Sequence, residues 1–153
     1  MGSSSVRVTQ DGLLWSTASV GVQSNEYVVG CGFDGTRWLS VLRSNLNGSL
    51  SFYQSTDGAL TWQAVEGVSM PSASMSQVSD LIYTGGAWVL VGRGPNIIMP
   101  ADWEGRVWVS TDGVSWVDRS APGMSSDVMA ATYGNGVLLV VGGTKIYRIA
   151  ICS

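Results

Sequence analysis

Histidine is absent from the 153 residues, and lysine occurs once, at Lys145. Without histidine the chain has no His-based general base, no Ser–His or Cys–His triad and no His-ligated metal site. Charged residues make up 12 % of the chain, about half of the roughly 25 % that is usual for globular domains. The formal net charge is −3, which argues against a nucleic-acid partner, because nucleic-acid binders need a basic face.

Cysteine and targeting signals are equally scarce. Cys31 and Cys152 lie far apart and form no CxxC or metal-ligand cluster. We expect both to be small buried hydrophobic residues, with a disulfide as the alternative. The first five residues show neither the basic nor the apolar region of a signal peptide, so the reduced state is the default. No apolar run reaches 18 residues, so no segment is expected to cross a membrane.

Apolar residues, glycine and tryptophan are what the chain does have. Hydrophobic residues make up 45 % of the sequence, with 20 Gly and 7 Trp. This composition excludes a disordered chain, which would need low hydrophobicity and high net charge. The length predicts one domain, spanning residues 1–153, with a sizeable core.

An Asp-Gly pair followed by tryptophan occurs three times. The three segments are Asp11-Gly12 with Trp15, Asp57-Gly58 with Trp62, and Asp112-Gly113 with Trp116. Asp-Gly is a strong turn signal, because both residues tolerate positive φ. The carboxylate can also accept nearby backbone N–H groups, and the indole can cover the turn. We interpret the three segments as structural turns and not as binding or metal sites.

A second series keeps step with these turns at an interval of 50 residues. Its members are Phe33-x4-Trp38, Tyr83-x4-Trp88 and Tyr133-x4-Leu138, each enclosing a glycine turn and leading into an apolar strand. Each unit therefore reads as strand, glycine turn, strand, connection, strand, Asp-Gly turn, strand. This pattern predicts an all-β fold of three repeats, each of about four antiparallel strands.

The tryptophan intervals place the boundaries of the repeats. Trp15 to Trp62 is 47 residues, and Trp62 to Trp116 is 54. From Trp116 through the C-terminus and on from the N-terminus to Trp15 is 52 residues. The predicted repeats are therefore about 16–62, about 63–116, and about 117–153 together with 1–15. The third would be closed by pairing of the N-terminal and C-terminal strands, which would hide a sheet edge.

One insertion and two tryptophans are the candidate contact sites. The insertion, residues 92–105, carries the apolar side chains of Ile97, Ile98, Met99 and Trp103 between prolines. It is interpreted either as a lid over the core or as a contact with another protein chain. Trp103 and Trp108 are the candidate platforms for a sugar ring. Trp108 alternates with Val107 and Val109, so it can equally face the other side of its sheet.

The repeated Asp-Gly turn with its tryptophan resembles the Asp-box of BNR and sialidase-like β-propellers. The matching strings are S-T-D-G before Trp62 and Trp116, together with Y-G-N-G-V-L-L-V-V-G at 133–142. Similar strings occur in bacteriophage tail and virion proteins. The first and third boxes are one residue shorter than the full motif, and Ala59 stands where glycine is usual in the second. Sialidase activity does not carry over, because the seven arginines are scattered and no paired carboxylates have supporting spacing.

Three propeller blades are too few to close around a channel, since propellers have 4–8. Two chains could form a six-bladed ring, or the three units could form a compact β-trefoil-like body. The resemblance favours propeller-type blades.

Together these features predict a non-enzymatic structural protein of a bacteriophage virion, a capsid decoration or a tail or neck component. It would have no cofactor or metal, and its partners would be other virion proteins and copies of itself. The alternative is a carbohydrate-binding module for host-surface glycans. A scaffold or assembly factor of a bacterial cell is a third hypothesis.

Overall fold

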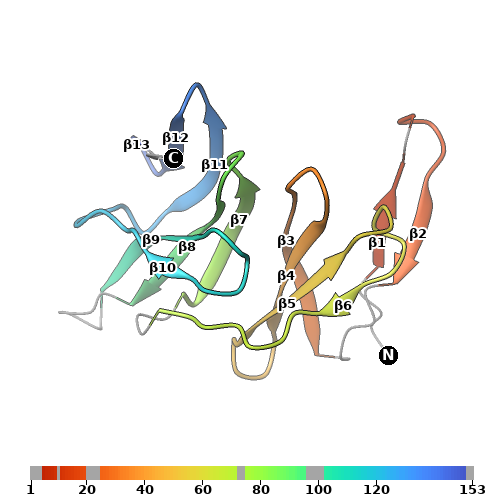
Figure 1. Cartoon of the computed structure of the whole chain (residues 1–153). Coiled ribbons are helices and arrows are strands. Elements are labelled where there is room, and N and C mark those ends of the chain that lie inside the picture. Colours follow the sequence, from red (N-terminus) through yellow and green to blue (C-terminus); the bar gives the residue numbers. More distant parts are fainter. Residues whose placement is uncertain (1–4, 10, 20–24, 72–74, 96–101, 151–153) are drawn as a thin grey trace. The chain divides into compact units, whose positions relative to one another are not determined.

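The computed structural model describes residues 5–9, 11–19, 25–71, 75–95 and 102–150 (Figure 1). These residues form 13 strands and no helix, and the strands build four antiparallel sheets. The prediction of an all-β fold is therefore confirmed. The chain divides into two compact units, Met1–Val65 and Glu66–Ser153, and each is described by itself.

The first unit holds a two-stranded hairpin and a four-stranded sheet. The hairpin is β1–β2 and the sheet has the order β3-β4-β5-β6. The strands are β1 (Ser5–Val8), β2 (Ser16–Ser19), β3 (Glu26–Phe33), β4 (Trp38–Ser44), β5 (Leu50–Ser55) and β6 (Gln63–Ala64). β2 pairs with β1, and the four-stranded sheet begins at Glu26. The predicted boundary of the first repeat, about residue 16, stays a prediction.

The second unit holds one four-stranded and one three-stranded sheet. Their orders are β10-β9-β8-β7 and β11-β12-β13. The strands are β7 (Gln77–Tyr83), β8 (Trp88–Pro95), β9 (Trp103–Ser110), β10 (Val117–Asp118), β11 (Val128–Gly134), β12 (Val137–Gly142) and β13 (Lys145–Ala150).

The interval of 50 residues reappears as a shared register. Each of the three larger sheets opens with a hairpin whose last pair is an aromatic residue opposite Trp or Leu, namely Phe33↔Trp38, Tyr83↔Trp88 and Tyr133↔Leu138. Each hairpin also carries a register shift at the same place, between Val28 and Gly30, Val78 and Asp80, and Val128 and Ala130. Residues 50 apart therefore hold equivalent positions on their sheets.

The strand count differs from four per repeat at the chain ends. Within the described residues β13 pairs with β12 as β5 pairs with β4 and β9 with β8. β1 leads into an Asp-Gly turn, as β5 and β9 do. Both β1 and β13 are thus equivalents of the third strand of a repeat. The described pairings place β1 against β2 and β13 against β12, so closure of the third repeat by the N-terminal strand stays a prediction.

In the second unit the core lies between the two sheets. Val89, Val91 and Val107 project from one face of the β7–β10 sheet and form one buried cluster with side chains of the following segment. Those side chains are Met124, Val128, Leu138 and Val140. Strand alternation explains the pattern along β12, where Leu138 and Val140 are fully buried while Leu139 and Val141 are exposed.

The expectation for the cysteines is wrong for the one that the structure describes. Cys31 lies on β3 as a free, exposed residue and not as a buried hydrophobe. Cys152 lies outside the described residues.

Candidate functional site

The three Asp-Gly turns share one hydrogen-bond design. Gly12, Gly58 and Gly113 have φ values of 75°, 75° and 72°, which favour glycine. In the third turn Asp112 Oδ1 accepts the backbone N–H groups of Val114 and Ser115 at 2.8 and 2.7 Å. Ser110 Oγ donates to the same oxygen at 2.8 Å and accepts the N–H of Gly113 at 2.8 Å.

The first turn repeats this design with threonine in place of serine. Asp11 Oδ1 accepts the N–H groups of Leu13 and Leu14 at 2.8 and 2.9 Å, while Thr9 Oγ1 accepts that of Gly12 at 2.9 Å. The second turn holds one extra residue, Ala59, at φ 66°. A left-handed conformation explains why glycine is usual at that position.

The hydrogen bonds in these turns stabilise the ionised carboxylates. The Thr61 hydroxyl and backbone N–H lower the pKa of Asp57 far below its ordinary value. The N–H groups of Ser115 and Val114 do the same for the pKa of Asp112, and those of Leu14 and Leu13 lower the pKa of Asp11. Carboxylates held this way have structural partners, which supports the interpretation of these residues as turn formers.

The tryptophans of the three turns are not equally covered. Trp116 is 4 % exposed and Trp62 is half-buried, with its indole N–H donating to the Ala59 carbonyl at 3.2 Å. Trp15 is 59 % exposed, and its neighbours Leu13 and Leu14 are 82 % and 79 % exposed. The first turn therefore presents apolar side chains where its equivalent in the third turn buries an indole.

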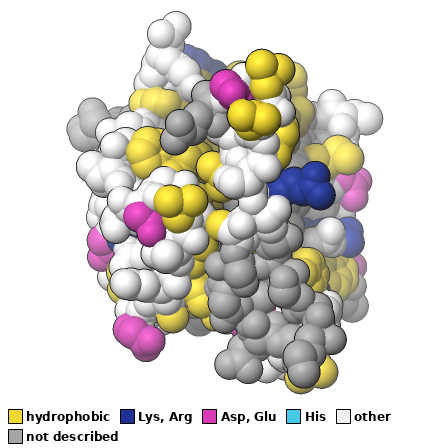
Figure 2. Space-filling model, turned by 90° about the vertical axis from the view of Figure 1, so that its right-hand side faces the viewer, with side chains coloured by type: hydrophobic (Ala, Val, Ile, Leu, Met, Phe, Trp, Pro, Cys, Tyr) yellow, Lys and Arg dark blue, Asp and Glu magenta, His cyan; other side chains and the backbone are white. Residues whose placement is uncertain are grey.

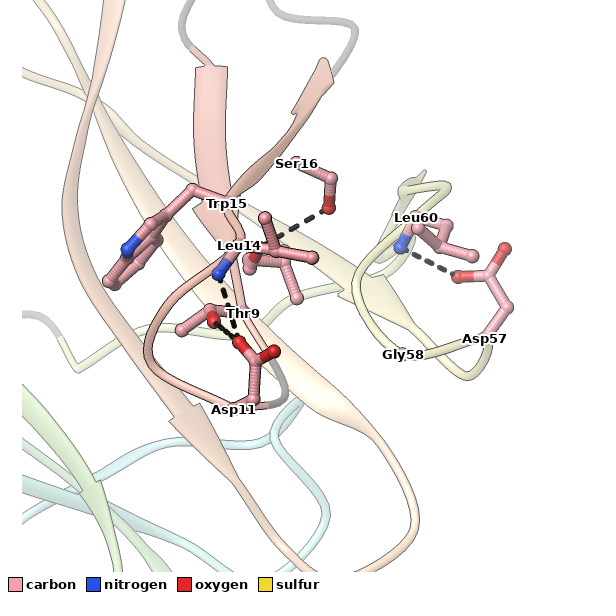
Figure 3. A pocket seen from close by; sticks show the side chains of 9 residues that line it. Thr9, Asp11, Leu14, Trp15, Ser16, Asp57, Gly58 and Leu60 are labelled. Carbon is pink, nitrogen blue, oxygen red and sulfur yellow. Dashed lines mark hydrogen bonds between the residues drawn. The ribbon is translucent and has the colours of Figure 1, made fainter.

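A pocket of about 380 Å³ lies between the first and second turns (Figure 3). Asp11, Leu14 and Trp15 line it from the first turn, and Asp57, Gly58 and Leu60 from the second. Leu60 is 59 % exposed. Figure 2 shows hydrophobic side chains at the surface, with acidic and basic side chains between them. Sequence reasoning missed this pocket, because it interpreted all three turns as structural turns and not as binding sites.

The predicted contact residues separate into three groups. Ile97, Ile98 and Met99 lie outside the described residues. Trp103, at the start of β9, is 49 % exposed, and the Arg93 guanidinium lies 5.4 Å from its ring centroid. Trp108 is 2 % exposed, so the prediction that it offers a sugar platform is not supported. It pairs with Leu90 and lies on the face of the sheet opposite to Val107.

Sequence reasoning also missed a buried ion-pair network on β9. Arg106 is 2 % exposed, its Nη2 lies 2.9 Å from Glu104 Oε1, and its Nη1 lies 3.5 Å from Asp118 Oδ2. Nη2 also donates to the Pro95 carbonyl at 2.6 Å. Glu104 and Arg106 are two residues apart, so they share a face of the strand. That spacing was the available signal, and the network fixes the β8–β9–β10 strands.

Within the part of the chain that the structure describes, no group of three His, Cys, Asp or Glu side chains could hold a metal ion. None of the described residues belongs to a helix long and apolar enough to cross a membrane.

No protein-family model matches the chain, and no curated protein matches it significantly.

Proposed function

We propose that the chain is a non-enzymatic structural protein of a bacteriophage virion, acting through protein–protein contacts as a capsid decoration or a tail or neck component. The observation that carries the proposal is the amount of apolar surface. Leu13, Leu14 and Ile146 are 71–82 % exposed, on a chain with few charged residues to keep a free monomer soluble. Exposed apolar patches mark contact sites.

The resemblance to Asp-box repeats supplies the virion assignment and the architecture. We propose that the three larger sheets are propeller-type blades of a ring completed by a second chain, with six blades in all. A β-trefoil-like body remains the alternative architecture. The shared register of the three hairpins supports repeating units. β1 and β13 both correspond to the third strand of a repeat. A four-stranded third repeat has room for only one of them, which favours a ring completed by a second chain.

Particle composition tests the proposal. Virions purified by density gradient from the phage that carries the gene are probed by immunoblotting and immunogold labelling, with the gene deletion as the control. We expect the protein in many copies at one location on each particle, head, neck or tail. Particles that lack the protein while infected cells contain it would refute the virion assignment.

A carbohydrate-binding module is the second candidate function. Trp103 and Trp15 offer exposed indoles, and Trp15 lines a pocket together with two carboxylates. A glycan array would show binding that Trp103→Ala or Trp15→Ala abolishes, with Leu46→Ala as an exposed control outside the pocket. Binding unaffected by both tryptophan substitutions would refute these sites.

A further inference from the structure

The two sheets of the second unit meet through unlike faces. We call face A the side of a sheet that carries Val89, Val91 and Val107, and face B the side that carries Leu81, Trp88 and Leu90. On the last sheet, Leu138 and Val140 are the equivalents of Trp88 and Leu90, so they belong to face B. The core cluster therefore joins face A of the β7–β10 sheet to face B of the β11–β13 sheet.

Face A has apolar residues at the same positions in all three larger sheets. The register makes three sets equivalent: Leu39, Val89 and Leu139; Val41, Val91 and Val141; Phe52, Val107 and Ile146. In the first two sheets these residues are 0–2 % exposed. In the last sheet Leu139, Val141 and Ile146 are 37 %, 38 % and 71 % exposed. The β11–β13 sheet thus exposes the face that the β7–β10 sheet buries in the core of the second unit.

On the β3–β6 sheet, face B is uncovered along β3, whereas Ser40 and Leu42 of β4, on the same face, are fully buried. Cys31 is exposed on β3, whereas its equivalents are Leu81, 1 % exposed, and Ala131, which packs against the core cluster. Phe33, next on the same face, is 45 % exposed. In the second unit the strand equivalent to β3 is β11, and β11 lies against β7 and β8. The uncovered part of face B is therefore on the strand that makes this contact.

We propose that face A of the β11–β13 sheet binds face B of the β3 strand of a second copy of the chain, repeating the packing found inside the second unit. The inference rests on the proposed function, because it names the partner of a protein that acts through protein contacts. The interface is heterologous, so association closes into a ring or continues as a filament according to the rotation between copies.

The interface between copies would be more apolar than the internal one. Inside the second unit, Ser79 Oγ donates to the Val128 carbonyl at 2.6 Å, and Asp80 Oδ2 accepts the Ala131 N–H at 3.1 Å. The equivalents of Ser79 and Asp80 on the last sheet are Met129 and Ala130. Met129 is 70 % exposed, so contact between copies would depend on apolar burial at this point.

Native mass is the first test, measured by light scattering on a size-exclusion column. We expect the wild-type chain to exceed the 16.1 kDa of one chain, and the double variant Leu139→Glu/Val141→Glu to elute as a single chain. Both side chains are exposed, so circular dichroism should be unchanged. Leu46→Glu, at a residue 81 % exposed in the β4–β5 turn, is the matched control and should keep the wild-type mass. A wild-type mass of one chain, or a double variant of wild-type mass, overturns the proposal.

Cross-linking identifies the partner surface by using the natural thiol of Cys31. Leu139→Cys or Val141→Cys is made in a Cys152→Ser background and oxidised. We expect a covalent dimer that Cys31→Ser abolishes and that Leu46→Cys does not form. A disulfide within one chain, showing that the chain's own first unit covers face A, overturns the proposal.

The two proposals fail separately. A dimer broken by Leu139→Glu/Val141→Glu in a protein absent from virions refutes the virion function and leaves this inference standing. A single-chain mass for a protein abundant in virions refutes this inference and the two-chain ring, and leaves the virion assignment standing.

Discussion

The adjacent glycines of the β7–β8 turn allow one prediction to isolate backbone strain. Gly85 has φ +82°, while the φ of Gly86 lies outside the left-handed range. A Cβ at either position would meet no atom within 4 Å. Replacing each by alanine therefore adds the same methyl group to the same turn, and the two variants differ in backbone conformation alone.

The expected difference follows from the cost of a left-handed alanine. Forcing an L-residue into that region costs about 1–2 kcal/mol, while alanine also lowers the entropy of the unfolded chain by the equivalent of about 0.4–1 kcal/mol of stabilisation. Gly85→Ala should therefore destabilise the protein by about 0–1.6 kcal/mol. Gly86→Ala, where φ lies outside that range, keeps the entropy gain alone and should stabilise the protein by about 0.4–1 kcal/mol. The turn itself is held by the Thr84 N–H donating to the Ala87 carbonyl at 2.9 Å, which neither substitution removes.

Urea denaturation followed by tryptophan fluorescence measures the difference. Trp88 reports on this hairpin, because it is 1 % exposed and contacts Tyr83 with ring centroids 5.0 Å apart. The midpoint for Gly85→Ala should fall below that for Gly86→Ala at unchanged slope. Equal midpoints, or a lower midpoint for Gly86→Ala, would refute the argument from backbone strain.

Three further predictions concern packing and charge. Gly92→Ala should prevent β7–β8 pairing, because its Cβ would lie 2.0 Å from the Gln77 carbonyl oxygen, and we expect a loss of more than about 3 kcal/mol in urea denaturation. Val140 is fully buried, so Val140→Ala should lower the free energy of unfolding by about 1.5–3 kcal/mol. Val117 is 50 % exposed, so Val117→Ala should lower it by less than about 0.5 kcal/mol. Equal shifts of the melting temperature would contradict the burial of β12. Asp112 has a lowered pKa in the folded state, so its contribution is present above its ordinary value of 3.8 and is lost as pH falls below that value. The melting temperature of Asp112→Asn should thus lie below that of the wild type at pH 6 and approach it toward pH 2, and a gap that widens on acidification would contradict the role of the carboxylate.

The turns and strands could be predicted because their signals are local. Asp-Gly and Asn-Gly pairs determine the backbone conformation over three or four residues, and Asn135 and Gly136 indeed have φ values of 50° and 72°. Apolar strands following at a fixed interval then give the repeat. The same local chemistry predicted the hydrogen bonds to Asp112, since a carboxylate two residues after serine can reach the N–H groups of its own turn.

Side-chain exposure could not be predicted from the repeat alone. Trp15 and Trp116 occupy the same position in their turns, yet one is exposed and the other buried. Cys31 and Leu81 differ in the same way. Burial depends on which sheet lies opposite, and that is a property of the position in the series and not of the local sequence. Arg106 was missed for a related reason, because its partner Asp118 comes from a neighbouring strand whose register is set by tertiary structure.

The apolar residues exposed on the β11–β13 sheet are the feature that a monomeric protein accounts for least well. Stacked repeat proteins need terminal repeats with a polar outer face, because an apolar end associates or aggregates. Here Leu139, Val141 and Ile146 keep the apolar residue type of their buried equivalents, although they are exposed in the single chain. Arg148, opposite Leu139, is an exposed charge on the same face. A sheet built to end the series would carry polar residues at these three positions, so the sequence favours a sheet that another copy continues.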